Sequence, residues 1–341
     1  MGGGQLGLMM IEAAHKIGLS VTVFADSRSC PAFKICDDFI ESSFTDMDTL
    51  SKFREQCDVF TVETENIHKD FLRIIEKRKN LFPSSNVIEI SQNRLVEKNF
   101  LNSLKNIETT RFFEVNNIKD LKDSAKNLNY NCILKTQEFG YDGKGQSTVK
   151  KENLCQFENQ ILQNCIIEEK VNFKLEISVI VARNSSNMIV YPPVKNIHKE
   201  SILRETIFPV KIDNHLKQSA IEKAIYISEN LDLNGVLAVE MFITNDDQIL
   251  INELAPRPHN SGHWTQNGCT VDQFEQHIRA IAGWNLGNGE RHCDVIMENL
   301  IGDEINKTND LIADGSVSLH LYGKVDIKPG RKMGHFNRII K

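Results

Sequence analysis

Residues 236–253 read VLAVEMFITNDDQILINE, the most informative pattern in the chain. Two apolar runs, 236–243 and 249–253, flank the polar turn 245–248, which predicts a β-hairpin. If Asp246 and Asp247 form a two-residue loop, Glu240 lies directly opposite Glu253. Asp-Asp is not the preferred turn pair, so a shifted register that turns one glutamate to solvent is the alternative.

Two glutamates that face each other need a positive partner, because like charges opposite each other destabilise a sheet. Hard cations such as Mg²⁺ are held by one or two carboxylates together with substrate phosphates. The pair Glu240 and Glu253 therefore predicts a magnesium site that works with a phosphorylated ligand.

The next segment, residues 255–265, reads APRPHNSGHWT and is dense in polar groups at the end of a strand. The spacing of His259 and His263 would suit two zinc ligands on a helix, but two prolines and a glycine within 256–262 oppose a helix, and no third ligand is evident. We therefore expect Arg257, His259 and Asn260 to orient a substrate close to the metal.

Cations and glycines recur at two further places. Lys135 ends an apolar run, and Lys144 lies in the glycine-rich segment 137–146, which suits a mobile flap, so both lysines could converge on a triphosphate. Near the C-terminus, Lys324, Arg331 and Lys332 lie among glycines, which is compatible with a site for a phosphate monoester or with a solvated turn.

Periodicity predicts an α/β protein. In the first 90 residues, helices at 5–16 and 69–78 alternate with strands at 21–24 and 58–62, which is typical of a parallel sheet covered by helices. After a helix at 92–104, strands are predicted at 111–115, 132–136, 166–169, 175–182, 235–243 and 249–254, with helices at 215–230 and 271–282. The second sheet is expected to be antiparallel, and strands at 295–300 and 317–322 form a small C-terminal β unit.

The N-terminus contains a pattern typical of another class of protein. Residues 2–7, GGGQLG, match G-x-G-x-x-G, and Asp26 lies about 20 residues further on, as in a dinucleotide-binding fold. The match is weak because no strand precedes it. This loop is either a phosphate-binding turn at a helix N-terminus or a plain tight turn.

Composition excludes several classes. The 341 residues include 40% hydrophobic and 25% charged residues, enough for a substantial core, and the net charge of -6 does not suit a nucleic-acid-binding protein. The 8 cysteines form no C-x-x-C pair and are expected to be reduced. With no long apolar segment and no signal peptide, neither membrane nor nucleic acid is expected as a partner, and the expected location is the cytoplasm.

Three motifs together resemble the ATP-grasp family: GYDGKGQ at 140–146, NELAPRPHNSGH at 252–263 and GRKMGH at 330–335. More narrowly, they resemble its branch that carboxylates an aminoimidazole ribonucleotide in purine biosynthesis. The likeness covers essentially the whole chain. It implies an ATP-grasp fold with an N-terminal Rossmann-like domain (1–90), an ATP-grasp domain (91–285, with a lid at about 105–168) and a small C-terminal β domain (286–341).

The resemblance implies a role for each matching residue. The implied ATP contacts are Arg94, Lys135, Gly140, Tyr141, Asp142, Gly143, Lys144, Gly145, Gln146, Glu168, Glu169, Lys170, Val171, Glu176, His198, Asn252 and Glu253. Glu240 and Glu253 would bind magnesium. The positions around bicarbonate and the imidazole are Tyr141, Lys144, Arg257, His259 and Asn260, and those near the ribonucleotide are Gln5, Leu6, Glu65, Lys324, Arg331 and Lys332.

The implied reaction consumes ATP with Mg²⁺, or Mn²⁺ as the alternative ion, to carboxylate 5-aminoimidazole ribonucleotide with bicarbonate through carboxyphosphate. The family also implies a homodimer. Two departures stand out: the family's strand before the glycine turn is not in this sequence, and Leu8 replaces a basic residue.

Three other functions remain open from sequence. A formate-dependent glycinamide ribonucleotide transformylase would share the flap and the glutamates. A nicotinamide-dependent dehydrogenase would use only the N-terminal glycines. A non-catalytic ATP-binding homologue would bind ATP without turnover.

Overall fold

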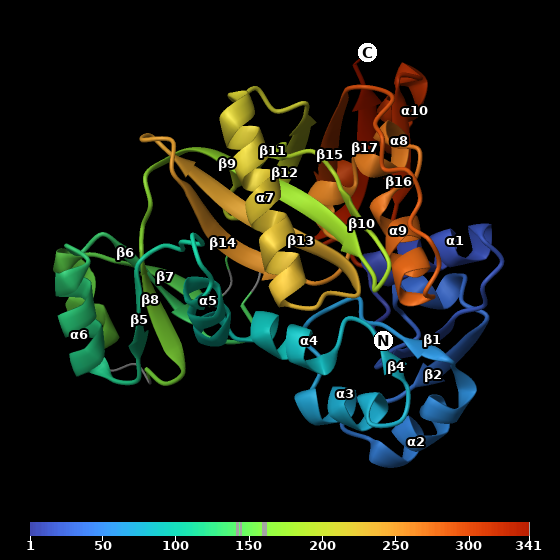
Figure 1. The fold of residues 1–341 in the computed structure, drawn as a ribbon, viewed down its shortest axis with the longest axis horizontal. Coiled ribbons are helices and arrows are strands. Elements are labelled where there is room, and N and C mark those ends of the chain that lie inside the picture. Colours follow the sequence, from blue (N-terminus) through green and yellow to red (C-terminus); the bar gives the residue numbers. More distant parts are fainter. Residues whose placement is uncertain (141–142, 144, 159–161, 341) are drawn as a thin grey trace.

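A computed structural model describes residues 1–140, 143, 145–158 and 162–340. The N-terminal part contains two short parallel pairs of strands (Figure 1): β1 (Thr22–Ala25) with β2 (Asp38–Glu41), and β3 (Val59–Phe60) with β4 (Asn80–Leu81). Around them lie α1 (Gln5–Lys16), η1 (Pro31–Lys34), α2 (Met47–Gln56), α3 (Lys69–Glu76) and α4 (Ser85–Gln92). Parallel pairing is confirmed, but the strands predicted at 21–24 and 58–62 lie in two separate two-stranded sheets rather than in one.

Aromatic side chains fill the core of this part. Phe24 packs against Phe53 and Phe71 with ring centroids 5.2 and 5.1 Å apart, and all three are buried. Met1 and Gly2 lie between the two pairs of strands, because the Gly2 amide donates to Phe24 and the Met1 ammonium donates to Thr61. The first two residues thus connect β1 with the segment after β3.

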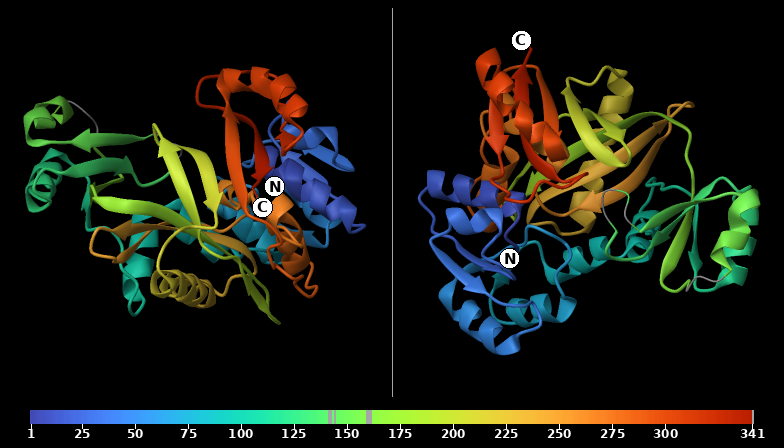
Figure 2. Two further views of the ribbon diagram at one scale, coloured as in Figure 1. Left: turned by 90° about the horizontal axis from the view of Figure 1, so that it is seen from above. Right: turned by 180° about the vertical axis from the view of Figure 1, so that it is seen from behind.

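The lid is a four-stranded antiparallel sheet that projects from the rest of the molecule (Figure 2). It follows α5 (Arg94–Ser103), and its strand order is β5 (Phe112–Val115), β8 (Cys165–Glu169), β6 (Cys132–Thr136) and β7 (Gln146–Val149). α6 (Ile118–Asn127) and η2 (Lys151–Phe157) pack on one side. The glycine-rich segment connects β6 to β7 at the edge of this sheet.

In the described residues, the central sheet has nine strands. They are β9 (Phe173–Arg183), β10 (Met188–Val190), β11 (Val194–Lys199), β12 (Ile202–Phe208), β13 (Gly235–Thr244), β14 (Ile249–Ala255), β15 (Val295–Ile301), β16 (Val317–Leu321) and β17 (Lys332–Ile339). The order is β14-β13-β9-β11-β12-β15-β17-β16, all antiparallel, with β10 beside β9. The antiparallel prediction is confirmed.

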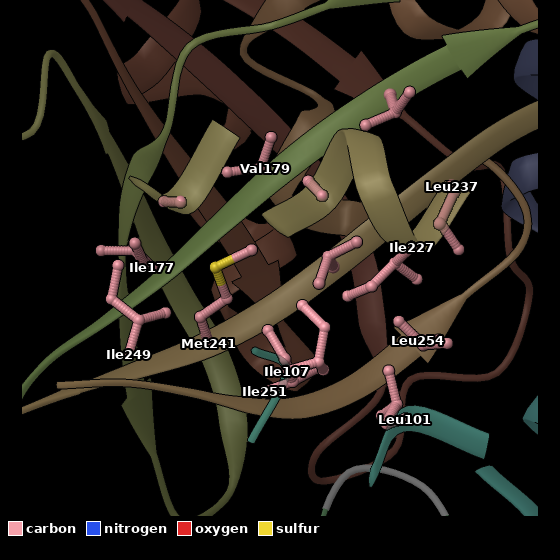
Figure 3. Close-up of a cluster of buried hydrophobic side chains, with 14 of the residues drawn as sticks. Leu101, Ile107, Ile177, Val179, Ile227, Leu237, Met241, Ile249, Ile251 and Leu254 are labelled. Carbon is pink, nitrogen blue, oxygen red and sulfur yellow. The ribbon is translucent and has the colours of Figure 1, made fainter. Parts of the chain in front are cut away.

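The main core lies between this sheet and α7 (Asn214–Asn230), where Ile177, Val179, Ile227 and Met241 pack together (Figure 3). The remaining elements are η3 (Asn260–Gly262), α8 (Thr265–Gly268), α9 (Gln273–Ile281), η4 (Gly302–Lys307) and α10 (Thr308–Asp314). The C-terminal strands continue the central sheet, because β12 pairs with β15. The division at residues 90 and 285 stays a prediction. None of the helices in the described part of the chain has the length and apolarity needed to span a bilayer.

The hairpin β13–β14 places Glu240 opposite Glu253, as predicted. The predicted two-residue loop is wrong. Thr244 and Gln248 close a three-residue loop in which Asp247 has a left-handed φ of 61°. A bulge beside Glu240 then shifts the register by one residue, so the two deviations cancel at the glutamates.

Candidate active site

A cleft of about 1290 Å³ lies between the lid, the central sheet, the N-terminal loops and the C-terminal strands. The predicted site residues that line it are Gln5, Leu6, Glu65, Arg94, Lys135, Gly140, Gly143, Gln146, Glu168, Glu169, Lys170, Val171, Glu176, His198, Glu240, Asn252, Glu253, Arg257, His259, Asn260, Lys324, Arg331 and Lys332. Gly145 is not part of the lining. Tyr141, Asp142 and Lys144 lie outside the described residues.

The floor of the cleft is acidic. Burial, and then the facing carboxylate of Glu253, raise the pKa of Glu240 to about 7. Sequence reasoning missed a third carboxylate, Glu97 on α5, whose Oε1 accepts a hydrogen bond from the Leu254 amide at 2.7 Å. Burial and Glu253 raise the pKa of Glu97 to about 8. Both raised pKa values mean that an added proton, or a cation in its place, is favoured beside Glu253.

Two lysines converge on the first residue of the predicted hinge. Lys135 Nζ lies 3.0 Å from Glu168 Oε2, and the Nζ atom of buried Lys98 lies 3.6 Å from the same oxygen. Burial favours the neutral acid, but both lysines outweigh it, so the pKa of Glu168 is lowered. Lys98 was missed because a lysine on a helix is usually a solvated residue.

The flap is anchored at its base. Arg94 donates to the carbonyl oxygens of Thr136 at 2.8 Å and Gly140 at 2.7 Å, which fixes where the flap leaves β6. At the other end, Gln146 Nε2 donates to Ser201 Oγ at 3.0 Å, across the cleft on the turn between β11 and β12. The described ends of the flap therefore connect the lid to the central sheet.

On the central sheet, His198 Nδ1 lies 2.6 Å from Glu176 Oε2. Burial alone would lower the pKa of His198, but the hydrogen bond to Glu176 and the nearby carboxylate of Glu240 raise it. His198 therefore carries positive charge more readily than an isolated imidazole.

The loop after β14 holds the next group of predicted residues. Arg257 makes a bidentate pair with Glu65, from Nε at 2.6 Å and from Nη2 at 3.1 Å. Although burial opposes ionisation, this pairing lowers the pKa of Glu65 and raises that of Arg257. The pair connects the N-terminal part to the central sheet and keeps both groups charged.

His259 and Asn260 are also held by neighbours. Burial, Arg257 and Lys332 lower the pKa of His259 well below its usual value, so the ring is neutral at pH 7. The Asn260 amide exchanges two hydrogen bonds with Asn299, at 3.0 and 2.7 Å. Its side chain therefore packs against the sheet at the edge of the cleft.

His263 does not pair with His259. Its ring is fully buried and packs on His335 with centroids 4.6 Å apart, while its Nδ1 lies 3.0 Å from Gln273 Nε2. Within the described ranges, no three His, Cys, Asp or Glu side chains are grouped so that they could hold a metal ion.

The N-terminal glycine loop is already occupied. The two carboxylate oxygens of Glu63 accept hydrogen bonds from the Gly4 amide at 2.5 Å and the Gly7 amide at 2.8 Å. A phosphate would bind the same amides, so its binding there is blocked by a carboxylate of the chain itself. We therefore expect no phosphate on these two amides, while Gln5 and Leu6 line the cleft and their role near the ribonucleotide stays a prediction.

The C-terminal cations reach the cleft from a turn and a strand. Lys324 Nζ donates to the carbonyl oxygen of Lys332 at 2.7 Å, and Arg331 Nη1 donates to that of Asp326 at 2.9 Å. Residues 332–335, for which a solvated turn was one of two interpretations, belong to β17.

The fold and the cleft define an ATP-grasp enzyme. The family model of the ATP-grasp domain matches residues 100–274. The ribonucleotide synthetase preATP-grasp domain matches residues 1–92, and the phosphoribosylaminoimidazole carboxylase C-terminal domain matches residues 295–341.

Similar proteins narrow the class. The chain is 39% identical to the N5-carboxyaminoimidazole ribonucleotide synthase of Bacillus subtilis, over 98% of this chain and 89% of that protein. It is 38% identical to the corresponding synthase of Brucella melitensis, over 99% of this chain and 95% of that protein. The chain belongs to the N5-carboxyaminoimidazole ribonucleotide synthases, ATP-grasp ligases of purine biosynthesis.

Solved structures of similar proteins support the same family assignment. An ADP complex of an N5-carboxyaminoimidazole ribonucleotide synthetase superposes with a TM-score of 0.94 at 39% identity, covering 99% of this chain and 90% of that one. The Aspergillus clavatus synthase in complex with ADP and 5-aminoimidazole ribonucleotide gives 0.90 at 30% identity, covering 99% and 92%.

Proposed function

We propose that this chain carboxylates 5-aminoimidazole ribonucleotide at the expense of ATP. A bicarbonate oxygen attacks the γ-phosphorus and ADP leaves, which gives carboxyphosphate. The exocyclic amine then attacks the carboxyl carbon, loses a proton and expels phosphate. The observation that carries this proposal is the opposed pair Glu240 and Glu253 in a cleft that is also lined by the hinge and by the C-terminal cations.

ATP would occupy the end of the cleft between the lid and the central sheet. Relatives of this chain have been solved with ADP and with ATP. Lys135 and Arg94 are cations of this chain that line the cleft there, and residues 168–171 form its hinge wall. Because carboxyphosphate is unstable in water, a flap tied to both sides of the cleft serves to exclude solvent.

The metal proposal rests on the chemistry of the donors. Glu240 and Glu253 are hard oxygen ligands, and the pKa of Glu240, raised by burial and by Glu253, supports the proposal of an added positive charge there. They would hold Mg²⁺, or Mn²⁺ as the alternative, with ATP phosphates supplying the remaining ligands. When bound, the ion would neutralise charge on the transferred phosphoryl group.

The ribonucleotide would lie at the other end of the cleft. Its phosphate would be held by Arg331 and Lys332, with Lys324 beside them, while the paired Glu65 and Arg257 also line the cleft. Arg257 and His259 are then placed to bind the carboxyl group in transit. The predicted roles of Tyr141 and Lys144 in the flap stay predictions.

The proposal is tested by ADP release from purified protein with Mg²⁺, ATP and bicarbonate, with and without 5-aminoimidazole ribonucleotide. We expect release that requires bicarbonate and is strongly stimulated by the ribonucleotide. Stimulation by glycinamide ribonucleotide with formate instead would contradict it. ATP binding without turnover under any combination would point to a non-catalytic homologue.

We also propose that the enzyme is a cytoplasmic homodimer. Its eight cysteines are free, which suits a reducing compartment. Light scattering during size-exclusion chromatography should give twice the 38.8 kDa mass of the chain, and a mass of one chain would refute the dimer.

A further inference from the structure

A buried chain of hydrogen bonds reaches His259 from the middle of the central sheet. Thr206 on β12 donates to Asn196 Oδ1 at 3.2 Å, and Asn196 Nδ2 donates to Ser178 Oγ on β9 at 3.1 Å. Ser178 Oγ donates to Ser261 Oγ at 2.7 Å, and Ser261 Oγ lies 2.9 Å from Nδ1 of His259. Thr206, Ser178 and Ser261 are fully buried, so water does not compete for these bonds.

The direction of the bonds determines which ring nitrogen carries the proton. Ser178 donates its own proton to Ser261, so the Ser261 hydroxyl proton points to Nδ1 of His259. The backbone amide of Ser261, which can only donate, also faces Nδ1 at 3.4 Å. Because two donors face Nδ1, this nitrogen accepts, and the ring proton is on Nε2.

The backbone of His259 is also held in place. The fully buried side chain of Gln273 accepts from the His259 amide at 2.9 Å and donates to the His259 carbonyl at 2.7 Å. The Nε2 atom then lies 3.7 Å from Glu240 Oε1. That separation is longer than a hydrogen bond, so the Nε2–H is placed to donate to a ligand oxygen beside Glu240.

We propose that Ser261 and Ser178 are positioning residues that hold His259 as the Nε2–H tautomer, so that the imidazole presents an N–H donor to an anionic oxygen of the carboxyl group in transit. This role rests on the proposed carboxylation. A ring in this tautomer acts as a donor, neither ligating the metal nor taking a proton through Nε2. The hydroxyl chain acts through His259 and does not touch the substrate.

The tautomer is read directly by NMR. In the full-length protein labelled with ¹⁵N-histidine, long-range ¹H–¹⁵N correlation at pH 7.5 should show His259 with a protonated Nε2 and a bare Nδ1; the signals are assigned by their loss in His259→Gln. In Ser261→Ala, the signature should shift towards the Nδ1–H form. A wild-type ring protonated on Nδ1, or on both nitrogens, overturns the proposal.

Steady-state kinetics test whether the serine hydroxyls that hold His259 affect turnover. Ser261→Ala should lower kcat about tenfold or more with little change in KM for ATP, and Ser178→Ala, which keeps the Ser261 hydroxyl, should have a smaller effect in the same direction. Ser228→Ala is the matched control, since Ser228 is also fully buried but bonds only within and beside α7. Equal losses in Ser261→Ala and Ser228→Ala would contradict a positioning role.

Replacing His259 by glutamine distinguishes a hydrogen-bond donor role of His259 from a role as a base. Glutamine places an N–H close to the position of Nε2, so His259→Gln should keep at least about tenfold more activity than His259→Ala. Equal loss in both overturns the donor role. The NMR measurement needs no turnover, so a protein that shows the predicted tautomer but no bicarbonate-dependent ADP release contradicts the proposed function alone.

Discussion

Glu253 supplies one of the two facing carboxylates, and its neutral isostere tests the metal assignment. Glu253→Gln should lower kcat about 100-fold or more while leaving the fold intact, because the amide keeps the shape of the side chain but not its charge. ADP release measures the loss, and circular dichroism with thermal unfolding checks the fold. Glu114→Gln is the control, since Glu114 lies exposed on β5. Wild-type turnover in Glu253→Gln would remove Glu253 from the metal site.

Arg331 and Lys332 are predicted to hold the ribonucleotide phosphate. Replacing both by Ala should raise KM for the ribonucleotide about tenfold or more and change KM for ATP little, since each charge-assisted hydrogen bond contributes about 1.5–3 kcal/mol. Initial rates at varied concentration of each substrate measure the two constants. The pair Lys119→Ala and Lys126→Ala, exposed on α6, controls for lost positive charge. Equal rises in both constants would indicate a folding defect instead.

For single residues, sequence reasoning finds those whose chemistry is visible in a motif and misses those whose role depends on a tertiary contact. The opposed pair was predicted from hairpin spacing alone. Glu97 and Lys98 were missed, because charged residues on an amphipathic helix look solvent-exposed until the helix packs against β14 and the hinge. The carboxylate of Glu63 at the glycine loop was missed because its partners are 56 and 59 residues away.

The elements were predicted better than their connections. The helices over 5–16 and 215–230 and the predicted strands β9, β13, β14, β15 and β16 form where periodicity placed them, since hydrophobic period reports the element directly. The strands β10, β11 and β12 of the same sheet were not predicted. The hairpin turn was not predicted correctly, because the loop length and the bulge depend on backbone geometry that the spacing of apolar residues does not record. β17 was missed because glycines and cations at its start resemble a turn.

Helix α5 carries both Arg94 and Glu97, so its N-cap affects the site. Asn93 Oδ1 accepts from the Leu95 and Val96 amides, and its Nδ2 donates to side chains at the base of the flap. Asn93→Ala should lower the free energy of unfolding by about 1 kcal/mol and also raise KM for ATP. Urea unfolding and initial rates measure the two effects.

The lid provides a matched control for this cap. Asn117 caps α6 with the same two backbone bonds, at 3.0 Å each, and lies outside the cleft. Asn117→Ala should cost a similar free energy without changing KM for ATP. If both variants raise KM equally, loss of stability rather than loss of anchoring explains the effect.

Across the whole molecule, His277 connects the N-terminal part to the central sheet. Its Nδ1 accepts from the Val236 amide at 3.2 Å, and its Nε2 lies 2.7 Å from Thr61 Oγ1. Burial lowers the pKa of His277 from 6.5 to about 3. Between these two pKa values the unfolded chain binds a proton on His277 that the folded chain does not bind. The contribution of neutral His277 to stability is therefore fully present above pH 6.5 and is lost as the pH falls below it.

This proton linkage predicts how steeply the free energy of unfolding falls with pH. Between pH 6.5 and about 3, His277 should reduce the free energy of unfolding by about 1.4 kcal/mol per pH unit. Urea unfolding of His277→Gln should show a shallower decline than the wild type, and His215→Gln, on the exposed surface of α7, should match the wild type. Parallel declines in wild type and His277→Gln would exclude His277 as a source of acid sensitivity.

The carboxylate of Glu63 acts as a tethered ligand for the first turn of α1. A side chain attached to the same fold competes with free anions at a high effective concentration, in the millimolar range or above. Dinucleotides should therefore neither bind this turn nor raise the melting temperature, although its glycines match their fingerprint. The first turn of α1 is then held by the chain itself, and ligand-induced stabilisation is expected from the cleft, which the N-terminal part helps to line.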